Sequence, residues 1–119
     1  MTRTLLYKIG TVIEVYATDA ARADAAAEAV TVVIDEVDRA VSRFREDSEI
    51  SRVTAAPGVW HELSAMAALC VTAALRAADL TDGLVDPTVG SDLIALGYDV
   101  TFSDVASDGV VQAVAIPRL

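Results

Sequence analysis

Apolar and polar residues alternate near the start of the chain, from Thr4 to Tyr16, in the sequence TLLYKIGTVIEVY. Because successive side chains of a strand point to opposite faces, this period of two predicts one long β-strand. Its apolar face is predicted to consist of Leu5, Tyr7, Ile9, Ile13 and Val15. Lys8, Gly10 and Glu14 fall on the other face, which we expect to meet water or a cleft, with Gly10 marking a bulge or a close backbone approach.

A helical period replaces the alternation after Asp19, a residue type that caps helix N-termini well. Apolar residues then recur at helical spacing and predict the clearest helix of the chain. They are Ala26, Ala27, Val30, Val33, Ile34, Val37 and Val41. A second helix is predicted from the N-cap Ser64 to about Asp79, and a short one over Ser91–Leu96.

The predicted strand lacks partners of its own length. Its backbone N–H and C=O groups need neighbouring strands, yet the other strand candidates in the sequence are short. The missing strands are therefore expected to come from sequence that is absent here or from a second molecule. On this basis the isolated chain should be marginally stable, or should self-associate through its unpaired first strand.

The chain of 119 residues is long enough for one domain or for a piece of a larger one. Its hydrophobic content of 54% predicts packed structure. The net charge of -9 argues against nucleic-acid binding, because contacts with phosphates need a basic surface. No apolar run reaches the ~18 residues of a membrane span, and no signal segment is visible, so a cytoplasmic location is expected.

Four arginines surround the polar segment Ser42–Val53 in this acidic chain. They are Arg39, Arg43, Arg45 and Arg52. Such a cluster can hold a phosphate group. The alternative is that Glu46, Asp47 and Glu49 neutralise these arginines in surface ion pairs, each of which contributes little to stability. Both interpretations are open from the residues alone.

A second polar segment, Asp82–Gly90, reads DGLVDPTVG and combines the flexible Gly83 with the rigid Pro87. A loop of this composition can present Asp86, Thr88 and backbone groups toward a cleft. The residue types predict a shaped turn that can also bind, and they do not identify the ligand.

Taken in order, the segments IGTVIEV, SRFREDSEISRV, DGLVDPTVG and LGYD resemble the amino-terminal half of the FAD:protein FMN transferases, the ApbE family. The resemblance extends from about Lys8 to Gly109 and includes the spacing between the segments. The matching positions are Gly10, Thr11, Ser42, Ser48, Glu49, Gly83, Asp86, Pro87, Thr88, Val89 and Gly90. The chain departs from the family at Ile9, where the family has methionine, at Phe44, where it often has tyrosine, and at Asp82, where it has glycine.

The resemblance implies an α+β fold with the ApbE-like, T-fold-like flavin transferase architecture. Residues 1–119 would be the amino-terminal part of that single domain, without its carboxy-terminal half. The implied reaction moves FMN from FAD to a threonine hydroxyl of a partner flavoprotein and releases AMP, with Mg²⁺ as the metal ion. In the family three loops line the FAD cleft. The residues expected by resemblance to touch the flavin nucleotide are Ile9, Phe44, Leu84, Val85 and Asp86.

The family's second half carries its metal ligands and a lysine-containing segment, and this sequence has no counterpart of either. We therefore assign no catalytic residue and no metal ligand within the chain, and we expect no turnover by the chain alone. One alternative is a non-catalytic flavin-binding or interaction module that retains the cleft loops. Another is a truncated gene product without a role of its own.

Overall fold

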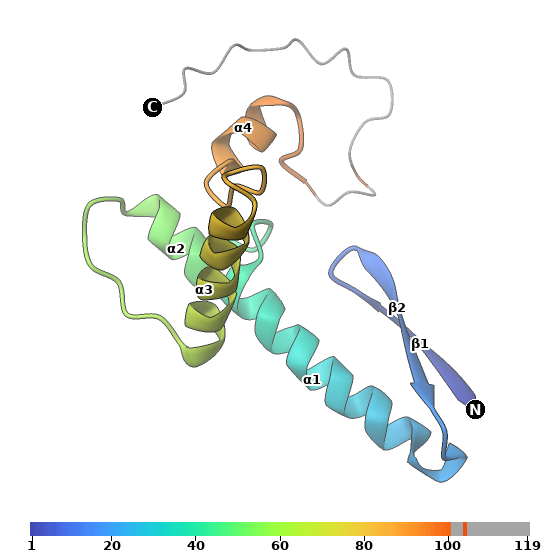
Figure 1. Cartoon of the computed structure of the whole chain (residues 1–119). Coiled ribbons are helices and arrows are strands. Elements are labelled where there is room, and N and C mark those ends of the chain that lie inside the picture. The colour runs from blue at the N-terminus through green and yellow to red at the C-terminus, as the bar shows by residue number, and fades with distance from the viewer. Residues whose placement is uncertain (101–103, 105–119) are drawn as a thin grey trace. The chain divides into compact units, whose positions relative to one another are not determined.

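The structure is a computed structural model and describes residues 1–100 and 104 (Figure 1). It divides into two compact units, Met1–Ala67 and Ala68–Leu119, and each unit is described by itself. Both strands and the longer helices confirm the expected mixture of helix and strand. The last part of the segment that resembles the ApbE family, toward Gly109, lies outside the described residues.

The first segment of the chain is a β-hairpin and not the single long strand that its alternation predicts. Strands β1 (Thr2–Lys8) and β2 (Thr11–Ala17) pair antiparallel over their full length, and Ile9 and Gly10 form the turn between them. The two turn residues have φ angles of 48° and 71°. Positive φ at both central residues is what a type I′ hairpin turn requires. The one-strand prediction is wrong because the alternation continues through this turn without the usual Asn-Gly or Asp-Gly signal.

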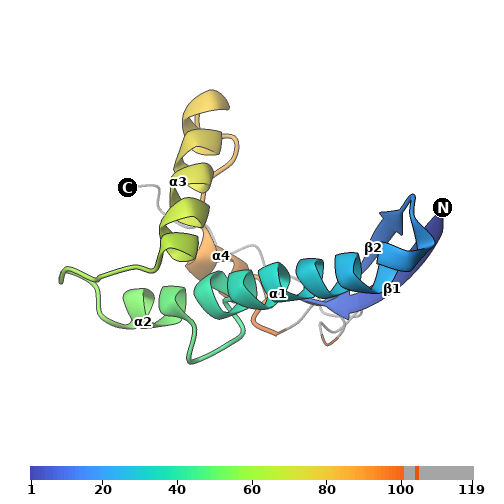
Figure 2. The ribbon, with the colours of Figure 1, turned by 90° about the horizontal axis from the view of Figure 1, so that it is seen from below.

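The first unit continues with helix α1 (Ala23–Val41), which confirms the helix predicted from the apolar spacing. Asp19 caps a preceding 3₁₀ turn, η1 (Ala20–Arg22), and its carboxylate accepts the backbone N–H of Ala21 at 3.0 Å. Helix α1 contacts both strands, and two views show the hairpin lying along it (Figures 1 and 2).

The hairpin turn also changes which apolar residues share a face. Leu6 lies opposite Ile13, whereas Tyr7 lies opposite Val12. Leu6, Ile13 and Val15 are half-buried, and Tyr7 is 75% exposed. The predicted common face of Tyr7 and Ile13 is therefore wrong, because a two-residue turn places odd-numbered residues of one strand beside even-numbered residues of the other.

Helix α2 (Glu49–Ala55) follows α1 after a short loop and contacts it. Its N-cap is Ser48, whose hydroxyl oxygen accepts the backbone N–H of Ser51 at 3.1 Å. The sequence prediction treated Ser42–Val53 as a polar loop and missed this helix, because so short a segment shows no helical period of apolar residues.

Helix α3 (Ala65–Leu80) confirms the second predicted helix, and the hydroxyl oxygen of Ser64 accepts the N–H of Ala67 at 3.2 Å as predicted for its cap. The boundary between the two units falls inside this helix. Helix α4 (Gly90–Ala95) confirms the predicted short helix to within a residue at each end. In the part of the chain that the structure describes, no helix is both long enough and apolar enough to cross a bilayer.

The hairpin bears on the predicted self-association. Strand β1 pairs with β2, so the premise of an unpaired first strand is wrong. Within residues 1–100 and 104, however, the sheet has two strands only, and each strand keeps one unpaired edge. The buried apolar residues there are all small, Ala23, Ala27, Ala40 and Ala67. We still expect a marginally stable or self-associating chain, because open edges and a small core favour both. Sedimentation at two concentrations checks this, and a concentration-independent monomer with a sharp two-state melt would contradict it.

Candidate functional site

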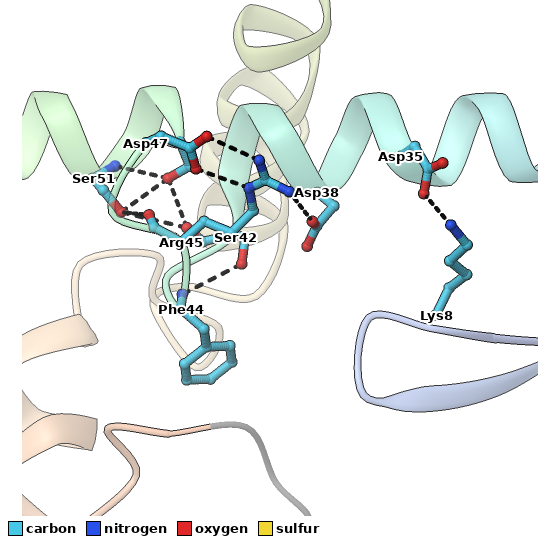
Figure 3. A network of polar contacts seen from close by, with 9 residues as sticks. Lys8, Asp35, Asp38, Ser42, Phe44, Arg45, Asp47 and Ser51 are labelled. Atoms are coloured by element: carbon cyan, nitrogen blue, oxygen red, sulfur yellow. Dashed lines mark hydrogen bonds and ion pairs between the residues drawn. The ribbon is translucent and has the colours of Figure 1, made fainter.

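The hairpin turn presents Ile9 to solvent in a strained conformation. Its side chain is 52% exposed, and a φ of 48° is unusual for a β-branched residue. Next to it, Lys8 Nζ lies 2.7 Å from Asp35 Oδ1 of α1, as Figure 3 shows. This ion pair attaches the turn to the middle of the helix.

The loop between α1 and α2 holds its arginines in different ways. Arg45 donates to Asp38 Oδ2 at 3.2 Å and to Asp47 Oδ2 at 2.9 Å (Figure 3). Hydrogen bonding from Arg45 lowers the pKa of Asp47, and the pKa of Arg45 is raised, first by Asp47 and then by Asp38. Arg45 is therefore neutralised by carboxylates, as the second interpretation of the arginine cluster predicts for Asp47. The partner Asp38 was not predicted.

Phe44 lies in the same loop and is 39% exposed. The guanidinium carbon of Arg43 lies 4.9 Å from the centre of its ring, which is a cation–π distance. The backbone N–H of Phe44 donates to the hydroxyl oxygen of Ser42 at 3.3 Å. The ring leaves the loop on the side away from the Arg45 ion pairs in Figure 3. Phe44 therefore keeps part of its surface exposed while Arg43 lies against its ring.

The structure places Ile9 and Phe44 in the same unit, Met1–Ala67. The Lys8–Asp35 ion pair fixes the turn on the helix, and Asp35 precedes Ser42 by about seven residues, or about 10 Å of helix. Two of the predicted flavin contacts thus come from adjacent elements of one compact unit.

The other three predicted contacts lie in the second unit, in the loop after α3. Asp82 and Gly83 have φ angles of 50° and 79°, and the N–H of Gly83 donates to the carbonyl oxygen of Ala78 at 2.9 Å, so they end the helix in a left-handed cap. Positive φ at Asp82 gives a physical reason for the glycine that the family has there. Leu84 and Val85 follow and are 92% and 49% exposed.

Asp86 is exposed, and its carboxylate is occupied within its own loop. Oδ1 accepts both the N–H of Thr88 at 2.8 Å and the hydroxyl of Thr88 at 2.7 Å. These bonds, the hydroxyl first and the backbone second, lower the pKa of Asp86. The aspartate therefore shapes the turn before α4 through Oδ1.

The described residues do not form a Mg²⁺ site. Within residues 1–100 and 104, no three or more His, Cys, Asp or Glu side chains are grouped so that they could hold a metal ion. Carboxylate pairs such as those around Arg45 bind the arginine instead. We therefore assign no metal-dependent step to these residues.

Glu49 connects the starts of two helices, and we expect this connection to depend on pH. Its carboxylate accepts the backbone N–H of Ser64 at 2.8 Å, and hydrogen bonding by Ser64 lowers the pKa of Glu49 below its usual 4.5. A lowered pKa in the folded state stabilises the protein above the unfolded pKa, and this contribution is lost as pH falls through the folded pKa. Glu49→Gln should therefore lower the melting temperature at neutral pH and matter less at about pH 3. Thermal unfolding of both proteins at the two pH values checks this; a difference that is independent of pH would contradict it.

Sequence reasoning missed several residues that organise the site. Asp35 and Asp38 lie on α1 outside its predicted apolar positions, and Ser51 carried no signal of its own. The partners of these residues lie on other elements, Lys8 on β1 and Arg45 in the loop, so no local pattern could have identified them.

The chain is similar to known proteins in both sequence and fold. The model of the ApbE family matches residues 9–115. No curated protein sequence matches the chain. The crystal structure of the ApbE protein from Thermotoga maritima is similar, with a TM-score of 0.72 and 25% sequence identity over 88% of this chain. The match covers 34% of that protein, so this chain spans about a third of its length. The fold is thus that of part of an ApbE protein, and the chain belongs to the ApbE family.

Proposed function

We propose that this chain forms part of the flavin-nucleotide cleft of an FAD:protein FMN transferase. In the proposed reaction a threonine hydroxyl oxygen of a partner flavoprotein bonds to the phosphorus on the FMN side of the FAD pyrophosphate. The bond from that phosphorus to the bridging oxygen breaks, and AMP leaves. The observation that carries the proposal is the ApbE match over residues 9–115, together with the structural likeness to an ApbE protein.

The geometry of the first unit supports a role in binding. Phe44 presents a flat ring on which an isoalloxazine or adenine ring can stack, and Ile9 adds an apolar contact at the hairpin turn. Ile9 is 52% exposed and Phe44 is 39% exposed, so part of each residue can meet a ligand. In the second unit, Leu84, Val85 and the backbone around Asp86 would supply further contacts with the nucleotide.

The chemical step needs groups that we do not assign here. A divalent ion such as Mg²⁺ would neutralise charge on the phosphates, and a base would accept the proton of the threonine hydroxyl. The described residues provide neither. We propose that residues 1–119 bind the nucleotide as the amino-terminal portion of one ApbE domain, and that turnover requires the remaining part of the fold.

The test combines binding and chemistry. The chain is titrated with FAD while its melting temperature and the flavin fluorescence are followed, and it is then incubated with FAD, Mg²⁺ and a threonine-containing acceptor protein. Saturable binding that raises the melting temperature supports the proposal, because a ligand stabilises the state that binds it. AMP together with flavinylated threonine would show that the chain is active alone. Two outcomes would overturn the proposed cleft. One is an FAD affinity that Phe44→Ala does not change, and the other is no binding of FAD at all.

A further inference from the structure

Ser48 is the buried polar residue of the described part of the chain, with an exposure of 0%. Its hydroxyl donates to the carbonyl oxygen of Ser42 at 2.7 Å and accepts the N–H of Ser51 at 3.1 Å. The hydroxyl of Ser51 lies 2.7 Å from the carbonyl oxygen of Arg45. These distances connect the start of α2 to two points of the loop before it.

The number of protons decides which of these contacts are hydrogen bonds. Each serine hydroxyl donates once. With Ser48 donating to Ser42 and Ser51 donating to Arg45, both hydroxyl protons are used in the shortest contacts. The 2.9 Å contact between the two hydroxyl oxygens is then close packing without a shared proton. Two carbonyl groups of the loop are thus held by α2, one on each side of Phe44.

From this geometry we infer that Ser48 and Ser51, the serine pair, are positioning residues that fix the loop backbone so that Phe44 presents its ring to the flavin nucleotide. The inference rests on the proposed function. A capping role alone does not explain Ser51, because its hydroxyl donates outside its own helix, to Arg45 in the loop. Figure 3 shows Ser51 beside the loop that carries Ser42, Phe44 and Arg45.

The physical consequence is reduced freedom of one exposed aromatic side chain. A loop of a few residues between two helices samples many conformations unless its backbone groups are bonded. Fixing the carbonyl groups of Ser42 and Arg45 removes this freedom before the ligand arrives. Preorganisation of this kind raises affinity without adding a contact to the ligand.

The test uses the full chain with Ser48→Ala, Ser51→Ala and the control Thr31→Val. The control also removes a hydroxyl, whose bond to the carbonyl oxygen of Ala27 stays inside α1 at 2.8 Å. Amide hydrogen exchange is measured without FAD, over residues 42–47. Loss of one hydrogen bond should raise exchange in this loop about five- to tenfold in each serine variant and leave it unchanged in the control. Ser51→Ala keeps the N-cap of α2, so it is informative even if Ser48→Ala does not fold.

The second measurement is a double-mutant cycle on FAD affinity with Phe44→Ala. Ser51→Ala alone should weaken FAD binding about fivefold, and it should have no further effect in the Phe44→Ala background if it acts through that ring. An equal effect in both backgrounds, or unchanged exchange in the loop, overturns the positioning role. A wild-type chain that binds no FAD overturns the proposed function instead, while the exchange data still decide whether the serine pair orders the loop.

Discussion

Replacing Ile9 by asparagine should make the protein more stable and a poorer binder of FAD. A β-branched residue at φ 48° is strained, by about 1 kcal/mol or more. Asparagine tolerates this conformation, and Asn-Gly is a favoured pair for the two central positions of a type I′ turn. The side chain of Ile9 is 52% exposed, so its removal costs little burial. We therefore expect Ile9→Asn to raise the free energy of unfolding by about 1 kcal/mol.

The effect on binding should have the opposite sign. Strained residues that folding does not require are characteristic of functional sites, and Ile9 is also a residue that the ApbE resemblance places against the flavin. Loss of its apolar contact should weaken FAD binding about tenfold, the equivalent of one partly buried aliphatic side chain. Urea unfolding and FAD titration of the same samples measure the two effects.

Leu5→Asn is the matched control for Ile9→Asn. Leu5 lies within β1 and is 37% exposed, so the same polar residue is introduced into a regular strand position. Asparagine is disfavoured in strands, and this variant should lose stability while retaining FAD affinity. If Ile9→Asn also lowers stability and leaves the FAD affinity unchanged, then Ile9 is not strained and does not contact FAD.

The helices α1, α3 and α4 were predictable from sequence because their signals are local. Asp19 and Ser64 are standard capping residues, and both accept backbone N–H groups in the structure. The apolar spacing up to Val41 extends over several helical turns, which is long enough to exclude other periods. Local signals of this kind survive in a fold because tertiary packing reinforces them.

The hairpin and α2 were not predictable in the same way. Ile9 and Gly10 make a turn in which only the glycine carries a signal, and the β-branched partner argues for a continuous strand. In α2, the box of N-cap serine and third-position glutamate is absent, because Ser51 occupies that third position and donates to the loop instead. In α2 the error comes from a residue, Ser51, whose hydroxyl bonds to the loop outside its own helix.

The same contrast between local signals and contacts across elements applies to the candidate site. The resemblance named the five residues that are predicted to contact the flavin, but the contacts that hold their segments in place run between elements. Lys8 and Asp35 are 27 residues apart, and Arg45 and Asp38 lie on different elements, so only the folded unit shows these two ion pairs. The alternative in which Glu46, Asp47 and Glu49 neutralise the arginines needed only the charges of this segment, and Asp47 does pair with Arg45.

Ala40, in the final turn of α1, is the most buried residue of that helix. Its exposure is 2%, and the helix on which it lies contacts α2. A leucine at this position adds volume where no space is open to solvent, so the helix or its neighbours must move. We expect Ala40→Leu to lower the free energy of unfolding by about 1–3 kcal/mol.

The control is Ala29→Leu, an exposed position of the same helix, which should change the stability by no more than about 0.5 kcal/mol. Because Ala40 lies two residues before Ser42, displacement of this turn should also disturb the loop that carries Phe44, and FAD affinity should fall together with stability. Denaturant unfolding and FAD titration of the two variants separate the outcomes. Equal losses in both variants would mean that the end of α1 is not closely packed and would contradict the prediction.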